Sequence, residues 1–194
     1  QISLVIAIDP AYSEDDKADY KVAALVGVDQ QGNHYLVSYV RTHAGCNEFF
    51  NAIINMWIYN KGKITAIGVP NSGTEKQFFK SFVDHCNQKK CYPPIVELKN
   101  SFVTQTGGSV RSKKSRIIAS LQPYFEAGKY YINASHSEAL DELLTIGSSR
   151  WDDVVDAMCY AEQILTPAFE DMTTSQDFSE VPRRQYTTNY GYSI

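Results

Sequence analysis

Two acidic sites, far apart in the sequence, carry the residue types best suited to chemistry. Asp9 ends an apolar run at residues 4–8. Near the other end of the chain, a second acidic cluster comprises Asp152, Asp153 and Asp156. A carboxylate at the end of a buried strand is costly to desolvate unless a cation or a hydrogen-bond donor meets it. If folding brings the two sites together, their oxygen atoms suit Mg²⁺ or Mn²⁺.

Such a pair of sites indicates phosphodiester hydrolysis. Two divalent ions held about 3.5–4 Å apart stabilise both the attacking and the leaving oxygen in that reaction. The cluster at 152–156 also has a structural interpretation, because an acid at the N-terminus of a helix is ordinary stabilisation. Three acids in one turn repel one another without a cation, however, and this favours metal binding. No histidine pairing, nucleophile motif or phosphate-binding loop points to another chemistry.

The basic residues are unevenly placed along a chain whose formal net charge is −4. Arg111, Lys113, Lys114 and Arg116 form one cluster. A local basic patch can hold a phosphate backbone even on an acidic protein. A solvated helix face explains the same charges equally well.

The elements that must position these residues follow from hydrophobic periodicity. Strands are expected at 2–8, 21–28 and 35–40, with a turn at 29–33 that makes them an antiparallel meander. Helical spacing or capping signals then alternate with short apolar strands. Two helices are expected at 46–59 and from Thr74 to 86. A third ends at Gly128, a fourth begins after a cap at Ser135, and a fifth spans 152–165. The further strands are expected at 64–69, 95–98 and 130–132. This order predicts an α/β domain with a mixed sheet flanked by helices.

Length and composition predict one domain at 1–166 followed by a tail or arm at 167–194, which lacks periodicity. No apolar stretch approaches about 18 residues, so no membrane span is expected. The chain does not begin with methionine, which suggests a piece of a longer protein.

Five short motifs together resemble the C-terminal nuclease domain of tailed-bacteriophage terminase large subunits. They are Ile8-Asp9-Pro10-Ala11, Ala18-Asp19-Tyr20, Pro70-Asn71-Ser72-Gly73, Lys114-Ser115-Arg116 and Asp152-Asp153-Val154-Val155-Asp156-Ala157. The resemblance covers roughly residues 2–165. It implies an RNase H-like fold with an antiparallel first half and parallel further strands. It also implies an Mg²⁺- or Mn²⁺-dependent endonuclease that cuts concatemeric double-stranded DNA during viral genome packaging.

Residue by residue, the resemblance makes Asp9 the metal ligand of the first strand. Asp153, and after it Asp152, match the acidic pair near the last helix, and Asp156 matches an acid one turn later. Lys114 and Arg116, with Arg111 and Lys113 beside them, match basic positions that could contact DNA. Two ions are expected if the site is complete.

One position departs from the family pattern. The acid usually found on the strand at 64–69 falls at Gly68, which offers no ligand. Either this chain is a weakened or inactivated form, or the alignment is shifted. Glu75 or Glu97 could substitute, although neither lies where the family would place it.

The resemblance also implies partners: an N-terminal ATPase domain of the same polypeptide, a portal protein and a small terminase subunit, in the cytoplasm of the infected host. Two alternatives stay open. One is another RNase H-like nuclease of resolvase or transposase type, and the other is a non-enzymatic module that docks on DNA or on a portal.

Overall fold

A computed structural model describes residues 1–10, 20–71, 73, 75–98, 113–148 and 151–167. Strands and helices alternate along most of this length, as the periodicity predicts. In chain order the elements are β1 (Ile2–Asp9), β2 (Lys21–Asp29), β3 (His34–Thr42), α1 (Cys46–Tyr59), β4 (Ile64–Pro70), α2 (Glu75–Gln88), β5 (Ile95–Leu98), α3 (Lys113–Glu126), β6 (Tyr130–Ile132), α4 (Ser137–Leu144) and α5 (Asp153–Ala161).

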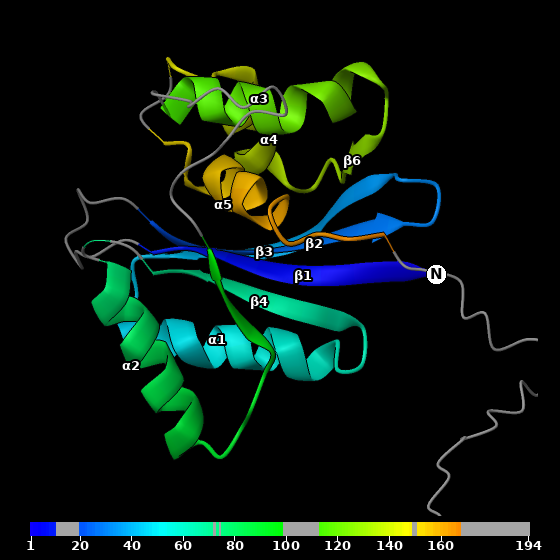
Figure 1. The fold of residues 1–194 in the computed structure, drawn as a ribbon. Coiled ribbons are helices and arrows are strands. Elements are labelled where there is room, and N and C mark those ends of the chain that lie inside the picture. Colours follow the sequence, from blue (N-terminus) through cyan, green and yellow to red (C-terminus); the bar gives the residue numbers. More distant parts are fainter. Residues whose placement is uncertain (11–19, 72, 74, 99–112, 149–150, 168–194) are drawn as a thin grey trace, which may run out of the picture.

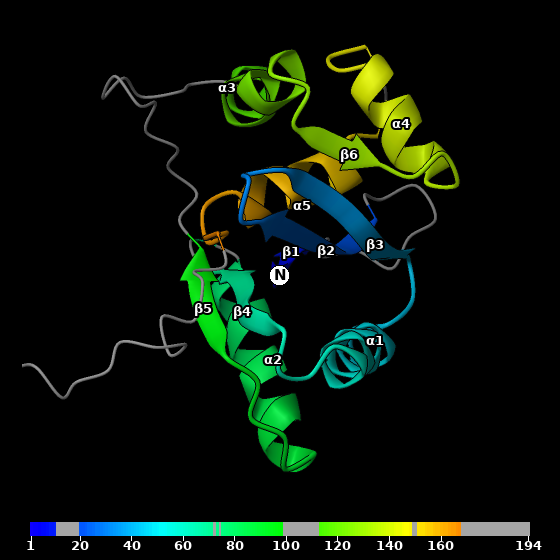
Figure 2. The same ribbon diagram turned by 90° about the vertical axis from the view of Figure 1, so that its right-hand side faces the viewer.

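The strands of the described residues form one mixed sheet in the order β5-β4-β1-β2-β3-β6. β1, β2 and β3 pair antiparallel, which confirms the predicted meander. β4 joins β1 in parallel, β5 joins β4 in parallel, and β6 joins β3 in parallel. The sheet therefore has an antiparallel centre with parallel strands on both sides (Figure 2).

Helices cover both faces of this sheet, and the central strand β1 shows how the faces are divided. Successive side chains of a strand point to opposite faces. Val5 and Ala7 of β1 lie in the core shared with α5. Leu4, Ile6 and Ile8 lie in a second core with α1 and α2. Figure 1 shows α5 directly on one face, with α3 and α4 beyond it, and α1 and α2 on the other face.

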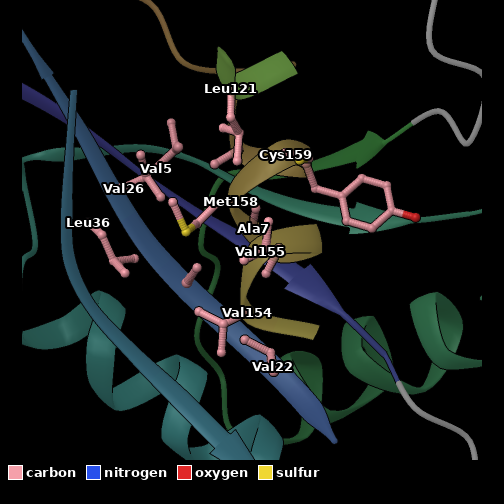
Figure 3. Close-up of a cluster of buried hydrophobic side chains, with 14 of the residues drawn as sticks. Val5, Ala7, Val22, Val26, Leu36, Leu121, Val154, Val155, Met158 and Cys159 are labelled. Carbon is pink, nitrogen blue, oxygen red and sulfur yellow. The ribbon is translucent and has the colours of Figure 1, made fainter. Parts of the chain in front are cut away.

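Helix α5 is the most enclosed element of the fold. All nine of its residues are buried, including two aspartates. It packs against β1 and β2 below and against α3 and α4 above. Figure 3 shows Val154, Val155 and Met158 of α5 among the side chains of β1 and β2. Any acid on this helix is therefore held between the sheet and a second helical layer.

Two predicted helix boundaries are wrong. Ser135 does not cap α4, because its backbone N–H and its hydroxyl both donate to Asn133 Oδ1 at 2.9 and 2.8 Å, and the helix starts after His136. α5 ends at Ala161 rather than at 165, because the following turn tightens to i→i−3 bonds from Gln163 and Ile164.

Other predictions lie outside the described residues: the Thr74 cap, the polar loop at 100–110 and the tail from 168 onward. Among the helices that the structure describes, none has the length and apolar content needed to cross a membrane.

Candidate metal centre

The strand geometry directs Asp9 toward the first turn of α5. Asp9 lies two residues after Ala7, so it is on the face of β1 that α5 covers. In the antiparallel register Asp9 pairs with Val22 of β2. Val22 in turn lies beside Val154 of α5 (Figure 3). The carboxylate at the end of β1 and the acids at the start of α5 therefore belong to one end of the sheet.

The three acids of α5 have different environments. Asp152 is the N-cap residue and is partly buried, whereas Asp153 and Asp156 are only 2% and 3% exposed. The backbone N–H of Tyr20, just before β2, donates to Asp153 Oδ2 at 3.3 Å. This contact ties Asp153 to the strand that pairs with β1.

The N-terminus of α5 is capped by Glu142 of α4. Asp152 makes no side-chain cap hydrogen bond. Instead, Glu142 Oε2 accepts from the backbone N–H groups of Val154 at 2.8 Å and Val155 at 3.1 Å, the positions that a capping side chain normally serves. The side-chain cap of this helix therefore comes from another helix, although Asp152 occupies the N-cap position.

Glu142 is 4% exposed, and burial raises the pKa of its carboxyl group to about 7. The nearby charge of Asp153 also raises this pKa, while the N–H groups of Val155 and Val154 and the guanidinium of Arg41 lower it. Near neutral pH Glu142 therefore adds only part of a negative charge to the acidic end of α5. Sequence reasoning missed Glu142, although it lies three residues after the buried Ala139, on the inward face of an amphipathic helix.

Tyr160 of α5 is a side chain on which the charges of three elements, β1, α2 and α5, act together. Its side chain is almost fully buried. Burial raises the pKa of its phenol, and the nearby carboxylates of Asp9, Glu75 and Asp156 raise it further. Glu75 is the first residue of α2. The charge of a carboxylate from α2 therefore acts on the same phenol as the charges of β1 and α5, while Glu97 on β5 is exposed.

The basic cluster divides between the centre and the surface. Arg116 of α3 donates from Nη2 to Asp156 Oδ1 at 2.5 Å, in an ion pair whose side chains are 17% and 3% exposed. Burial alone lowers the pKa of the Arg116 guanidinium. The charge and the hydrogen bond of the neighbouring Asp156 carboxylate together have the larger effect, so the pKa is raised overall. Lys114 is exposed on the same helix. Arg111 and the side chain of Lys113 lie outside the described residues.

Gly68 lies on the α5 face of β4, next to Ala7 of β1 in the parallel register. A Cβ at this position would come within 2.7 Å of Leu98 and 2.8 Å of Ile164, both apolar side chains. An acid at 68 would thus point into the core near the C-terminal end of α5. The register, continued by two residues, brings Pro70 rather than Gly68 to the level of Asp9.

The donor set fits a hard divalent ion in its chemistry, because all the acids supply carboxylate oxygens from elements that converge on Tyr160. As the side chains are placed, the described residues include no group of three or more His, Cys, Asp or Glu arranged to hold a metal ion. The carboxylates would have to draw together to coordinate one.

A cation–aromatic stack borders the centre on the β3 side. The guanidinium carbon of Arg41 lies 3.5 Å from the centroid of the Tyr20 ring and 5.9 Å from that of Trp151. The rings of Tyr20 and His43 have their centroids 3.7 Å apart. This stack holds Tyr20 in place, and the backbone N–H of Tyr20 donates to Asp153. Hydrophobic periodicity in the sequence did not predict the stack.

No protein-family model matches the sequence, and a search of curated proteins finds no match. Solved structures share the fold at low sequence identity. The large terminase nuclease from thermophilic phage G20c has a TM-score of 0.58 at 14% identity, over 86% of this chain and 84% of that one. A human cytomegalovirus terminase nuclease domain gives 0.56 at 13%, over 85% and 83%. An Mn-soaked, inhibitor-bound structure of the cytomegalovirus domain gives 0.52 at 13%, over 84% and 81%. The chain therefore has the RNase H-like fold of these nuclease domains, as the motifs predicted.

Proposed function

We propose that this chain is a divalent-metal-dependent nuclease domain that cuts double-stranded DNA, of the kind used in viral genome packaging. The observation that carries the proposal is the placement of Asp9 and Asp153. One ends β1, the other begins α5, and both belong to the same end of a sheet with the fold of terminase nuclease domains. The cytomegalovirus domain was soaked with manganese, which supports a divalent ion in this fold.

Asp9 and Asp153 are the residues that would hold the ion. Glu75 is our candidate for a third carboxylate, because its charge acts on the same buried phenol as that of Asp9. Asp152 lies next to Asp153 at the helix start and is a further candidate. A bound divalent ion supplies Lewis-acid chemistry: it lowers the pKa of a bound water and polarises the scissile phosphate.

The other residues of the centre position these acids. Glu142 fixes the first turn of α5 through two backbone N–H groups. Tyr20 fixes one oxygen of Asp153 through its own N–H. Lys114 is exposed on α3, the helix whose Arg116 reaches the centre, and can contact a DNA phosphate. The protein thus orients the ligands and leaves a positive side chain toward the substrate.

The wider setting belongs to the same proposal. The motifs support a nuclease portion joined to an ATPase domain, working with a portal protein and a small subunit in the cytoplasm of an infected host. The likeness to both a phage and a cytomegalovirus domain leaves the class of virus open.

A cleavage assay tests the function. Protein stripped with chelator is incubated with supercoiled plasmid and with linear duplex, with and without Mn²⁺ or Mg²⁺. We expect metal-dependent cutting of both, lost in Asp9→Asn and in Asp153→Asn. Asp84→Asn is the matched control, because Asp84 is an exposed acid of α2 away from the centre.

Other outcomes discriminate the alternatives. Cutting confined to four-way junctions would favour a resolvase. Salt-sensitive DNA binding without any cutting, unchanged in Asp9→Asn and without a metal requirement, would favour a docking module. No cutting and no metal binding by calorimetry would contradict the nuclease assignment.

A further inference from the structure

The ion pair between Arg116 and Asp156 places a fixed positive charge inside the candidate metal centre. Its two atoms lie 2.5 Å apart, and the Asp156 side chain is 3% exposed. A charge-assisted contact this short and this enclosed is a strong one. Separating it would leave a buried carboxylate without its cation, which is strongly unfavourable.

The guanidinium of Arg116 also lies over the ring of Tyr160. Its carbon lies 5.3 Å from the ring centroid. The charges of Asp9 and Glu75 act on the phenol of the same residue and help to raise its pKa. Arg116 is therefore packed on a side chain that the charge of Asp9 reaches, in addition to being the partner of Asp156.

Two metal ions held about 3.5–4 Å apart need carboxylates on both sides of the pair. One feature of this chain reduces that supply, because Asp156 is engaged by Arg116. A second dication beside Arg116 would moreover meet a like charge at close range.

We propose that Arg116 is a fixed cation of this centre and takes the place of one metal ion. Resting on the proposed nuclease function, this assigns a single divalent ion to Asp9 and Asp153, with Asp156 kept for Arg116. The positive charge opposite that ion is then supplied by the protein and does not depend on metal concentration.

The test counts the metal ions that the folded chain binds. Chelator-stripped protein is titrated with Mn²⁺, and bound ions are counted by calorimetry and by the electron paramagnetic resonance signal of free Mn²⁺. We expect one ion per chain in the wild type and in Arg116→Lys, which keeps the charge. Arg116→Gln releases Asp156, and we expect a second ion to bind there.

Two ions of similar affinity in the wild type would overturn the inference, as would a single ion of unchanged affinity in Arg116→Gln. No ion in the wild type would instead contradict the proposed function itself, so the two failures are distinguishable. If Arg116→Gln does not fold, the wild-type count still decides, because the inference requires it to be one.

Discussion

The two ends of α5 are built from similar parts. Each end pairs a glutamate, whose side chain is at most 8% exposed, with a basic side chain of β3. At the C-terminal end Glu162 meets His34, and at the N-terminal end Glu142 meets Arg41. Burial raises the pKa of both glutamates.

The two pairs differ in how closely they are matched. His34 Nδ1 lies 3.1 Å from Glu162, and its ring packs 4.0 Å from that of Tyr124. Arg41 Nε lies 3.7 Å from Glu142 Oε1. Within the described part of the chain, neither of these last two atoms has a hydrogen-bond partner, although both are buried.

A buried polar atom without a partner costs free energy. Among the described residues the C-terminal end has such an atom too, the hydroxyl of Tyr130 near Glu162, so the unpartnered atoms do not separate the two ends. The acids separate them. The N-terminal end of α5 also carries Asp153 and Asp156, whereas the C-terminal end carries no comparable acids. We therefore regard the C-terminal end as structural and the N-terminal end as the functional one.

The largest expected effect is on activity at the N-terminal end. Asp153→Asn removes a proposed metal ligand but keeps the side-chain shape, so we expect cleavage to fall about a thousandfold, because residues that hold one ion act as a unit. The unfolding free energy should change by less than about 1 kcal/mol. Plasmid cleavage and thermal unfolding measure the two. If the variant lost its activity only because it unfolds, Asp153 would be a structural residue, and the N-terminal end of α5 would not differ in role from the C-terminal end.

A second test introduces an acid toward the C-terminal end. Gly68→Glu forces a carboxylate against Leu98 and Ile164, so we expect overpacking and an unpaired buried charge to lower the unfolding free energy by about 3 kcal/mol. Gly68→Ala, which adds only the Cβ, is the milder control. Denaturant unfolding measures both. Higher cleavage activity in a stable Gly68→Glu protein would show that this position belongs to the metal centre after all.

A third test uses pH. Folded Glu142 titrates near 7 and its ordinary pKa is 4.5, so between these values the folded chain binds the proton more tightly than the unfolded chain. Stability that is present below about pH 4.5 is therefore lost as the pH rises to about 7, by on the order of 2 kcal/mol for this group. Glu142→Gln should flatten this part of the stability–pH curve, measured by denaturant unfolding in chelator. An unchanged slope would contradict the assigned environment.

The smallest expected effects compare the two glutamates directly. Glu142→Leu removes the cap of α5 and Glu162→Leu removes the partner of His34, and each should cost about 1 kcal/mol of stability. Only Glu142→Leu should also lower cleavage, by about tenfold, because it loosens the turn that carries Asp153. Equal activity in the two variants would mean that the cap does not position the metal ligands.

The sequence predicted those features that depend on neighbouring residues of the chain. The apolar run of β1 and the carboxylate that ends it predicted that Asp9 stands at the end of a buried strand. The antiparallel meander of the first three strands was predicted with the turn at 29–33. The acids at 152–156 were recognised as a helix start. These features depend on local pattern and on short-range geometry.

The features that could not be predicted from the sequence depend on contacts between elements that are distant along the chain. Glu142 caps a helix other than its own, and nothing in its neighbourhood of the chain signals that. Arg116 resembles a surface base of α3 until the packing of α3 on α5 brings it to Asp156. Gly68 was expected to mark a missing ligand, and only the packing of Leu98 and Ile164 around it shows that its surroundings are apolar.

The most direct test of the central claim is a crystal of this chain soaked in Mn²⁺. The anomalous scattering of manganese locates each bound ion without reference to activity. We predict one anomalous peak, between Asp9 and Asp153, with Arg116 still paired to Asp156. The absence of a peak at these residues in crystals that bind manganese elsewhere would contradict the assignment of this end of α5 as a metal centre.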